Sequence, residues 1–337
     1  MLAGNRCGIY HPARLMNNSV CGPEMVERPL VYVLEPIAPS AVATLKQSCD
    51  VVDPGDSRKE DWPDDADGII VRTSRITAGQ LNAARRLKVI GKHGVGVDNI
   101  DLDAARARGI AVISTPGANA NAVAELAVGM ALSVARRINL LDRLLRDGNF
   151  SGSPPQGFEL TGRTVGVVGM GSVGRRTADL FRKAFGAPLL AFDPFAPDSA
   201  FTEVGAERYT GLDAMLPQVD LLTLHIPLTP DTANLIDGRR LDLMRRDAIL
   251  LNLSRGGIVD ETALHAALSK GRIAGAASDV FVEEPPQPDH PLLSLGNFVA
   301  TPHIGAATAE SMERMGMEVV AGVVAFLNGG TPRHRVV

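Results

Sequence analysis

The segment 164–174, TVGVVGMGSVG, constrains the fold of this 337-residue chain more than any other stretch. Its small and β-branched residues, typical of a parallel strand covered on both faces, run directly into Gly169, Gly171 and Gly174. Such glycines allow a tight turn, close approach of a pyrophosphate to bare backbone, and close packing of a helix on the strand. Helical periodicity from Ser172 onward places the phosphate at a helix N-terminus, where free N–H groups favour an anion. The segment therefore predicts a dinucleotide-binding strand–turn–helix unit.

Size and composition narrow the class of protein. A chain of this length with 45% hydrophobic and 21% charged residues can form two globular domains, each with its own core. The net charge of −4 disfavours nucleic acid as a partner, and no apolar run reaches the roughly 18 residues of a membrane span. Cys7, Cys21 and Cys49 form no disulfide framework, so a reducing cytoplasm is expected. Residues 1–28 lack a secretory signal and regular periodicity and are predicted to be a poorly ordered extension.

The remaining chain alternates predicted strands with predicted helices, which indicates parallel sheets joined by right-handed crossovers. The first series has strands at 30–35, 50–53, 66–72, 87–92 and 110–114 and helices at 40–47, 78–86 and 102–108. A long helical pattern at 119–147, interrupted only by Gly129, precedes the glycine segment. Later strands are predicted at 188–192, 220–226, 248–253, 273–279 and 297–301.

The last predicted helix, 306–327, is too isolated to build a domain and is expected to cross back onto the first series. We therefore predict an α/β protein of two domains. A Rossmann doubly wound parallel sheet would occupy 119–305, and a smaller flavodoxin-like domain, discontinuous in sequence, would combine 29–118 with 306–337.

The cofactor preference is predicted from Asp193, which ends the strand after the glycine turn and lies 19 residues beyond Gly174. A carboxylate there accepts hydrogen bonds from the adenosine ribose and repels the 2′-phosphate of NADP, so NAD is favoured. The alternative is that Asp193 caps the turn before Pro194. No cluster of His, Cys and carboxylate residues has metal-ligand spacing.

Three candidate catalytic residues, Arg255, Glu284 and His303, follow later predicted strands. Transfer of a hydride to a cofactor needs a clamp for the substrate, a group that polarises the carbonyl, and a proton donor or acceptor. In an open α/β sheet such groups lie beyond the carboxyl ends of the strands. The spacing therefore places all three residues at one site.

At these residues the chain resembles the NAD-dependent D-2-hydroxyacid dehydrogenases, and among them short-form phosphoglycerate dehydrogenases without a C-terminal regulatory domain. The matching segments, in order, are GVGVDNID (94–101), VAELAVGM (123–130), GMGSVG (169–174), HIPLTPDT (225–232), NLSRGGIVDE (252–261), SDVFVEEPP (278–286) and TPHIGAAT (301–308). The resemblance implies that His303 is the general acid–base, that Glu284 pairs with it, and that Arg255 binds the substrate carboxylate and polarises the carbonyl. It also implies that Asp279 binds the nicotinamide amide. The other cofactor contacts would come from Ser172, Val173, His225, Ile226, Leu253, Ser254 and Gly305.

Each role has a structural alternative. His303 would be a buried core histidine, Arg255 would cap the following helix, and Asp279 would cap a turn. Glu283 is the rival of Glu284. Three further histidines have no evident partners and are assigned to the surface or to packing: His93, His265 and His290.

Substrate choice is expected to come from the first domain. Arg72, Ser74 and Arg75, in the turn VRTSRIT, would bind a substrate phosphate, unless Arg75 is simply a solvated charge. Backbone N–H groups at Gly94, Val95 and Gly96 would bind the carboxylate.

These features predict NAD-dependent interconversion of 3-phosphoglycerate and its keto acid, with reduction of glyoxylate or hydroxypyruvate as the alternative. The family resemblance also allows an NAD-binding corepressor that recruits protein partners, although the chain has no long disordered tail for that purpose. The apolar residues on several faces of the 119–147 helix indicate a second buried surface and hence a homodimer.

Overall fold

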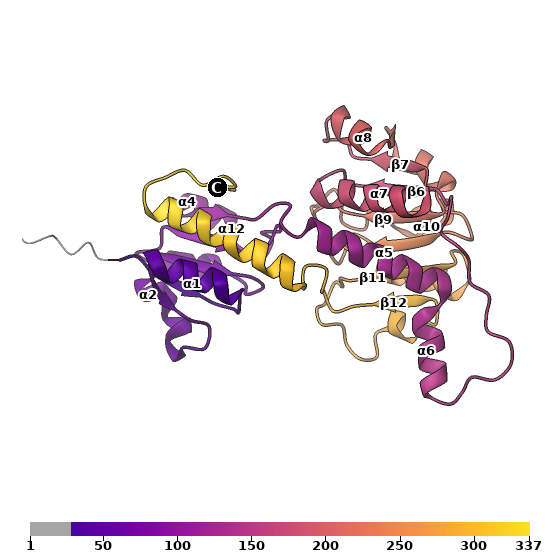
Figure 1. The fold of residues 1–337 in the computed structure, drawn as a ribbon, viewed down its shortest axis with the longest axis horizontal. Coiled ribbons are helices and arrows are strands. Elements are labelled where there is room, and N and C mark those ends of the chain that lie inside the picture. The colour runs from indigo at the N-terminus through magenta and orange to yellow at the C-terminus, as the bar shows by residue number, and fades with distance from the viewer. Residues whose placement is uncertain (1–27) are drawn as a thin grey trace, which may run out of the picture.

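The computed structural model describes residues 28–337 as two α/β bodies arranged along the longest axis of the molecule (Figure 1). We call them the five-stranded body, whose strands lie within 30–113, and the seven-stranded body, whose strands lie within 165–300. The extension predicted at 1–28 falls, apart from Arg28, outside the described residues. Within those residues no helix has the length and apolar character that crossing a membrane requires.

The five-stranded sheet is parallel and has the order β2-β1-β3-β4-β5, which is the flavodoxin-like order. Its strands are β1 Leu30–Val33, β2 Asp50–Val52, β3 Gly68–Val71, β4 Val89–Lys92 and β5 Ala111–Ile113. The helices of this body are α1 Pro39–Ser48, η1 Ser57–Asp61, α2 Trp62–Asp65, α3 Ala78–Ala83, α4 Leu102–Ala107 and, from the far end of the chain, α12 Ala309–Leu327. Apolar clusters cover both faces, as the strands of a parallel sheet require.

Helix α12 lies across the five-stranded sheet, against α1 and β4 (Figure 1). The approach is close, because a Cβ built on Gly91 of β4 would lie 2.6 Å from Val323 and 2.7 Å from Val319. The helix begins where the Thr308 side chain accepts a hydrogen bond from the Ser311 N–H. A segment late in the chain therefore completes the core of the first sheet.

The seven-stranded sheet is also parallel, with the order β12-β11-β10-β9-β6-β7-β8. Its direction of winding reverses between β6 and β9, as in a Rossmann fold, so the predicted fold class is confirmed. The strands are β6 Val165–Val168, β7 Leu189–Phe192, β8 Glu207–Tyr209, β9 Leu221–Leu224, β10 Ile249–Asn252, β11 Gly275–Ser278 and β12 Phe298–Ala300. The helices are α5 Ala120–Arg136, α6 Ile138–Arg146, α7 Ser172–Phe185, α8 Asp198–Val204, α9 Leu212–Met215, η2 Leu216–Gln218, α10 Gly238–Leu243, α11 Glu261–Ser269 and η3 Pro291–Ser294.

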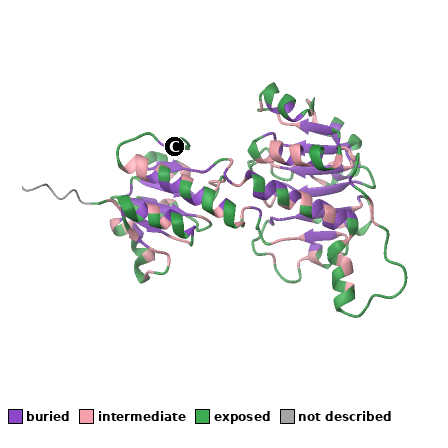
Figure 2. Cartoon of the chain, in the orientation of Figure 1, coloured by how far each residue is buried: buried purple, intermediate pink, exposed green. Residues whose placement is uncertain are grey.

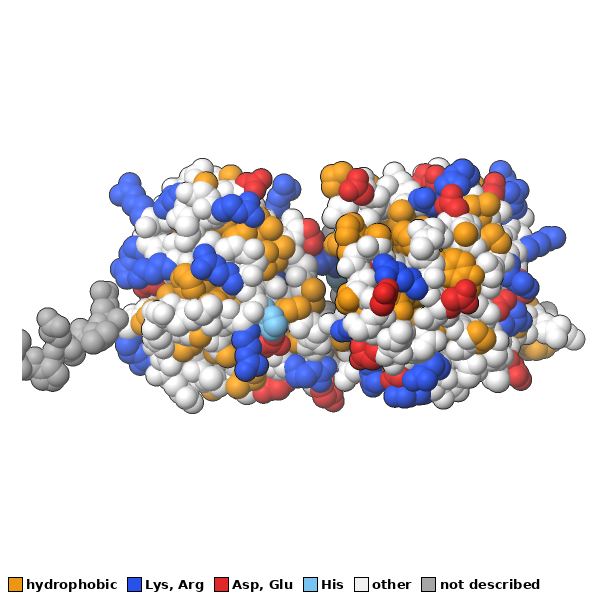
Figure 3. All heavy atoms as spheres, turned by 90° about the horizontal axis from the view of Figure 1, so that it is seen from above, with side chains coloured by type: hydrophobic (Ala, Val, Ile, Leu, Met, Phe, Trp, Pro, Cys, Tyr) orange, Lys and Arg blue, Asp and Glu red, His pale blue; other side chains and the backbone are white. Residues whose placement is uncertain are grey.

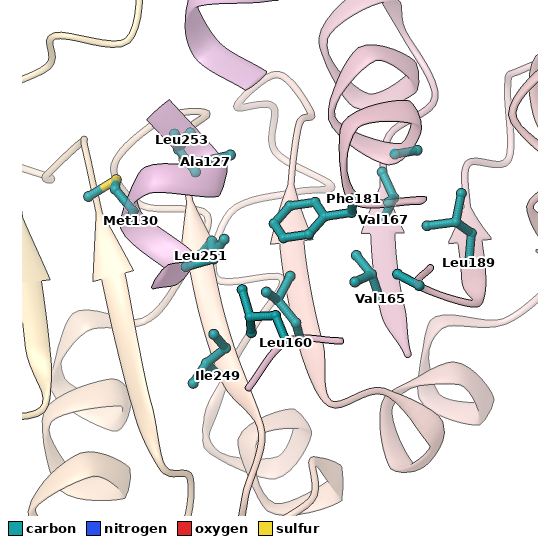
Figure 4. Packing of buried hydrophobic residues seen from close by; sticks show 14 of the residues in the cluster. Ala127, Met130, Leu160, Val165, Val167, Phe181, Leu189, Ile249, Leu251 and Leu253 are labelled. Carbon is teal, nitrogen blue, oxygen red and sulfur yellow. The ribbon is translucent and has the colours of Figure 1, made fainter. Parts of the chain in front are cut away.

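The core of the seven-stranded body lies between its sheet and the helices on either face. Figure 2 shows buried strands at the centre and helices whose outer sides are exposed. On one face Phe181 of α7 packs beside Val165 and Val167 of β6, with Leu251 of β10 and Ala127 of α5 in the same cluster (Figure 4). This packing fixes α7, and with it the glycine turn that precedes it.

The prediction of one long helix at 119–147 is wrong, because the chain forms two helices there, α5 and α6. Gly129 does not interrupt α5; the break is at Arg137, whose φ of 54° is left-handed. The carbonyl of Ala135 accepts the N–H of Phe158, from the segment after α6, at 3.0 Å. A continuous helix would use that carbonyl for the N–H of Asn139, so the tertiary contact ends α5. The short edge strand β8 was also not predicted.

Replacing Gly91 with alanine is expected to lower the free energy of unfolding of the five-stranded body by about 1–3 kcal/mol, because the new methyl group overlaps α12. The measurement is urea unfolding followed by fluorescence of Trp62, the chain's single tryptophan, which is buried in this body. Gly79→Ala, at an exposed position in α3 with no close contact, is the matched control and should unfold at or above the wild-type midpoint. Equal stability of the two variants would contradict the close packing of α12.

Candidate active site

A cleft of about 540 Å³ lies between the two bodies, and the surface is notched there (Figure 3). It is lined by residues that follow strands of both sheets, so the carboxyl ends of two parallel sheets face one space. Most of the predicted catalytic and substrate residues line it, namely Arg72, Gly94, Val95, Gly96, Arg255, Glu284 and His303, and so does Asp279, a predicted cofactor-binding residue. Ser74 and Arg75 do not, and both are exposed in the turn after β3.

His303 and Glu284 form a hydrogen-bonded pair, with 2.7 Å between the histidine Nδ1 and the carboxylate Oε2. The carboxylate can only accept, so Nδ1 carries a proton and Nε2 is left for a ligand. Burial alone would raise the pKa of Glu284, but hydrogen bonds from His303 and from the Phe281 N–H outweigh it and lower the pKa. The His303 side chain is 47% exposed, which does not fit a core histidine. The rival Glu283 is exposed and bonds to Gln287.

Asp279 holds the loop that carries His303. Its buried carboxylate accepts hydrogen bonds from the Thr301 hydroxyl at 2.6 Å and from the N–H groups of Ile304 and Gly305, both at 2.8 Å. His303 itself has a left-handed φ of 54°, which non-glycine residues rarely adopt. The predicted alternative, an acid that caps a turn, therefore describes most of what Asp279 contacts, although its side chain also lines the cleft.

Arg255 reaches across the cleft to the five-stranded body. Its Nε lies 3.1 Å from Asp98 Oδ1, and its Nη1 donates to the carbonyl of Ser254 at 2.7 Å. The guanidinium lies against Gly96 so closely that a Cβ there would be 1.6 Å from Nη2. The cap of the following helix is Asp260, whose side chain accepts from the Ala263 N–H, so Arg255 does not serve as the cap.

The glycine turn lies at the point where the second sheet reverses its winding. Gly169 has a φ of 93°, and a Cβ there would lie 2.4 Å from the carbonyl of His225 at the end of β9. A Cβ on Gly174 would lie 1.9 Å from the carbonyl of Gly169, so α7 and the turn are in direct contact. Gly171, by contrast, is exposed and its Cβ position is open. A phosphate group fits above that bare backbone, at the N-terminus of the 14-residue helix α7.

Asp193 lies beside this turn and accepts the Met170 N–H at 2.8 Å. Its other oxygen accepts the N–H groups of Phe195 and Ala196, so the predicted turn cap is present. Three donors leave capacity for a further hydrogen bond on the carboxylate.

The predicted adenosine-side residues are packed against the same turn. His225 bonds through Nε2 to Thr223 at 2.9 Å, and burial lowers the pKa of its imidazole to about 3. Ser254 ties two loops together, because its hydroxyl donates to the Leu224 carbonyl and accepts the Ile226 N–H. The donor set and the open glycine backbone fit a dinucleotide.

Two cationic side chains lie at the far end of the cleft, and only one of them was predicted from the sequence. Arg72 was predicted, but Lys92 was missed. Lys92 is 8% exposed, and its Nζ donates to the Arg72 carbonyl and, at 2.8 Å, to Asn99 Oδ1. Burial lowers the pKa of Lys92 to about 8. Its position at the carboxyl end of β4, directly before the turn 93–96, was the sequence signal that could have identified it as a cleft residue.

The predicted phosphate-binding turn is partly occupied by Glu35. This carboxylate accepts the N–H groups of Arg72, Thr73 and Ser74 at 2.6–2.9 Å. Burial would raise the pKa of Glu35, but these bonds outweigh it and lower the pKa. These N–H groups are therefore unavailable to a ligand. The turn lines the cleft with Arg72 and Thr73, and the Thr73 hydroxyl also donates to Glu35.

All three histidines that were predicted to have no partner have one, and for His265 it is the nearby Ser269 hydroxyl at 3.5 Å. The other two have partners far along the chain. His93 is buried, lines the cleft and places Nε2 3.3 Å from the Met312 carbonyl. His290 lies 3.2 Å from Glu261. Both partners are distant in sequence, which is why local pattern did not indicate them.

The sequence profile described as "D-isomer specific 2-hydroxyacid dehydrogenase, NAD binding domain" matches residues 128–305. The chain is 38% identical over 303 residues to D-3-phosphoglycerate dehydrogenase of Methanocaldococcus jannaschii, covering 89% of this chain and 57% of that protein. It is 39% identical over 320 residues to glyoxylate reductase of Thermofilum pendens, covering 90% of this chain and 93% of that protein. The chain thus spans about three-fifths of the length of the first phosphoglycerate dehydrogenases that it matches.

Among solved structures, a protein of Thermus thermophilus superposes with a TM-score of 0.82 at 37% identity. The match covers 91% of this chain and all of that one. The likeness therefore extends over both bodies.

Proposed function

Because the chain belongs to the D-isomer specific 2-hydroxyacid dehydrogenase family, we propose that it interconverts a D-2-hydroxy acid and its 2-keto acid with NAD. Bound NAD would take the hydrogen from the substrate's second carbon as hydride. The NAD-binding domain would be residues 119–305, and the substrate domain would combine 29–118 with 306–337. The sheet and helix arrangement supports these boundaries.

The substrate carboxylate is placed by Arg255 and the turn Gly94–Val95–Gly96. The planar guanidinium can bind a carboxylate bidentately and also polarise the adjacent carbonyl. Arg255 already lies against Gly96 and pairs with Asp98, which holds it at the cleft. The burial of Asp98 would raise the pKa of this carboxyl, but the charge of Arg255 outweighs it and lowers the pKa. Asp98 therefore remains ionised and orients the arginine.

His303 exchanges the proton of the substrate hydroxyl. With Nδ1–H bonded to Glu284, the lone pair of Nε2 accepts that proton during oxidation and returns it during reduction. The carboxylate of Glu284 stabilises the imidazolium that forms. Asp279 fixes the loop geometry on which this alignment depends.

The substrate that we favour is 3-phosphoglycerate, and the observation that carries it is the pair Arg72 and Lys92. No Asp or Glu side chain of residues 28–337 lies within ion-pair distance of either cation where they line the cleft. Lys92 is buried and Arg72 is half-buried, and Asp98 and Glu35 attract Lys92 only from beyond ion-pair distance. Cations withdrawn from water without a paired carboxylate are unfavourable until an anion binds. A second anionic group on the substrate, in addition to the carboxylate that Arg255 binds, would supply that negative charge.

Glyoxylate or hydroxypyruvate reduction remains the second candidate, and Glu35 favours it. The backbone donors of the 72–74 turn are taken by that carboxylate, so the cleft lacks the full anion cradle that the sequence predicted. The glyoxylate reductase of Thermofilum pendens, which this chain resembles over most of both lengths, supports the same candidate.

The chain is also proposed to form a homodimer through α6. This helix has no buried residue, and Ile138 and Leu145 are 52% and 69% exposed. It projects from the seven-stranded body (Figure 1). A symmetric partner would cover these side chains.

Turnover with a panel of acids tests the proposed function. Wild-type protein should reduce NAD with D-3-phosphoglycerate, and His303→Ala should lower kcat by about 10²–10⁴-fold because proton transfer is lost. His265→Ala, on the outer helix α11, is the control and should retain wild-type kcat. Absence of turnover with every 2-hydroxy acid and keto acid would refute the function, and an unchanged kcat in His303→Ala would refute the role of that residue.

The two arginines of the 72–75 turn should behave differently. Arg72→Ala is expected to raise KM for 3-phosphoglycerate by about 10–100-fold, equivalent to about 1.4–2.8 kcal/mol of lost binding. Arg75→Ala, which removes an exposed charge outside the cleft, should change KM by less than about twofold. A larger rise in KM for Arg75→Ala than for Arg72→Ala would contradict this assignment and support Arg75 as the phosphate-binding residue.

Sedimentation equilibrium tests the homodimer. The wild-type chain should sediment at twice the 35.6 kDa mass of the chain, and Leu145→Asp should shift it toward monomer because the charge cannot be buried in the interface. Arg146→Asp, at the neighbouring exposed position, is the comparison for added negative charge. A monomeric wild type contradicts the proposal.

A further inference from the structure

His93 is a buried histidine of the cleft to which the proposed mechanism gives no task. It directly follows β4, is 4% exposed and lines the cleft beside Lys92 and Gly94. Its Nε2 lies 3.3 Å from the Met312 carbonyl in α12. A carbonyl can only accept, so Nε2 carries the proton and Nδ1 of the neutral ring is a bare acceptor. Nδ1 is buried and has no hydrogen-bond partner among residues 28–337.

The charges around His93 are arranged for an anion. Burial first, and then the positive charges of Arg72 and Lys92, lower the pKa of the imidazole to about 4, so the ring is neutral near pH 7. From α12 the ring meets the Met312 carbonyl, while the charged neighbours Glu313 and Arg314 bond to Ser40 and to the Ala118 carbonyl.

The carboxylates at this end of the cleft are engaged elsewhere. Asp98 is paired with Arg255, and Glu35 with the N–H groups of the 72–74 turn. Neither of them is bonded to His93. The charged groups that act on the ring are therefore cationic.

We propose that His93 is a third contact of the distal oxyanion of the substrate, meaning the anionic group on its third carbon, and that His93 takes up one proton when this group binds. The inference rests on the proposed function, since it needs a distal anion between Arg72 and Lys92. That anion offsets the positive charges of Arg72 and Lys92, which add to the effect of burial in keeping the ring neutral. Protonated His93 then donates a hydrogen bond from Nδ1 to the anion, while Nε2–H keeps its hydrogen bond to the Met312 carbonyl.

The sign of the pH dependence follows from this linkage. The pKa of His93 is low in the free protein and higher in the complex, so binding takes up a proton at pH values between the two. In that range each unit of rising pH weakens binding of the distal anion up to about tenfold. An acid without a distal anion does not show this dependence. Measurements below pH 7.5 keep Lys92, with its pKa of about 8, charged.

The experiment is calorimetric titration of D-3-phosphoglycerate into the NADH-loaded protein, in which the reaction cannot proceed. Two buffers of different ionisation enthalpy at pH 7.0 give the number of protons taken up. Wild-type protein should take up about one proton more than His93→Gln, whose amide reaches the anion but does not titrate. His93→Asn serves if the glutamine variant does not fold, and His265→Gln should match the wild type.

Steady-state KM between pH 6.0 and 7.5 gives the second readout. For 3-phosphoglycerate, KM should rise with pH more steeply in the wild type than in His93→Gln, whereas the KM of glyoxylate should have the same slope in both proteins. Equal proton uptake in the two proteins, with 3-phosphoglycerate bound and turned over, overturns the assignment of His93 alone. Turnover of glyoxylate without any binding of 3-phosphoglycerate overturns the proposed substrate, and the inference with it.

Discussion

The two sheets of this protein are parallel, and the carboxyl ends of their strands meet at one cleft. That constraint decides where chemistry can occur, because a parallel strand delivers its following loop to the same edge as its neighbours. The five-stranded sheet brings Arg72, Lys92 and His93 to the cleft, and the seven-stranded sheet brings Arg255 and the His303 loop. The packing of α5 and α7 on one sheet, and of α1 and α12 on the other, maintains these edges.

Charge pairing inside the cleft differs between its two ends. Arg255 is paired with Asp98, and His303 with Glu284, so each of these two side chains is oriented by a carboxylate. Arg72 and Lys92 have backbone or amide oxygens as partners. This asymmetry supports the proposal of a catalytic pair at one end of the cleft and an anion site at the other, and with it a substrate with two negative groups.

Much of the fold and several site positions could be predicted from sequence because they depend on local pattern. The uniform apolar run before Gly169, and the polar residues directly after later strands, placed Arg255, Glu284 and His303 at one sheet edge. The features that local pattern could not predict depend on contacts between residues far apart in the sequence. Glu35, which takes the N–H groups of a turn nearly forty residues later, fixes Arg72 rather than Arg75 as the cleft residue. The Phe158 N–H, which ends α5, is a contact of the same kind.

The most direct test of this account is a crystal structure of the protein with NADH and D-3-phosphoglycerate bound. We expect the carboxylate at Arg255 and the Gly94–Gly96 turn, the substrate hydroxyl at His303 Nε2, and the phosphate between Arg72 and Lys92. A phosphate seated at Arg255, or a substrate carboxylate at Arg72 with no group near His303, would contradict the assignment of the two ends of the cleft.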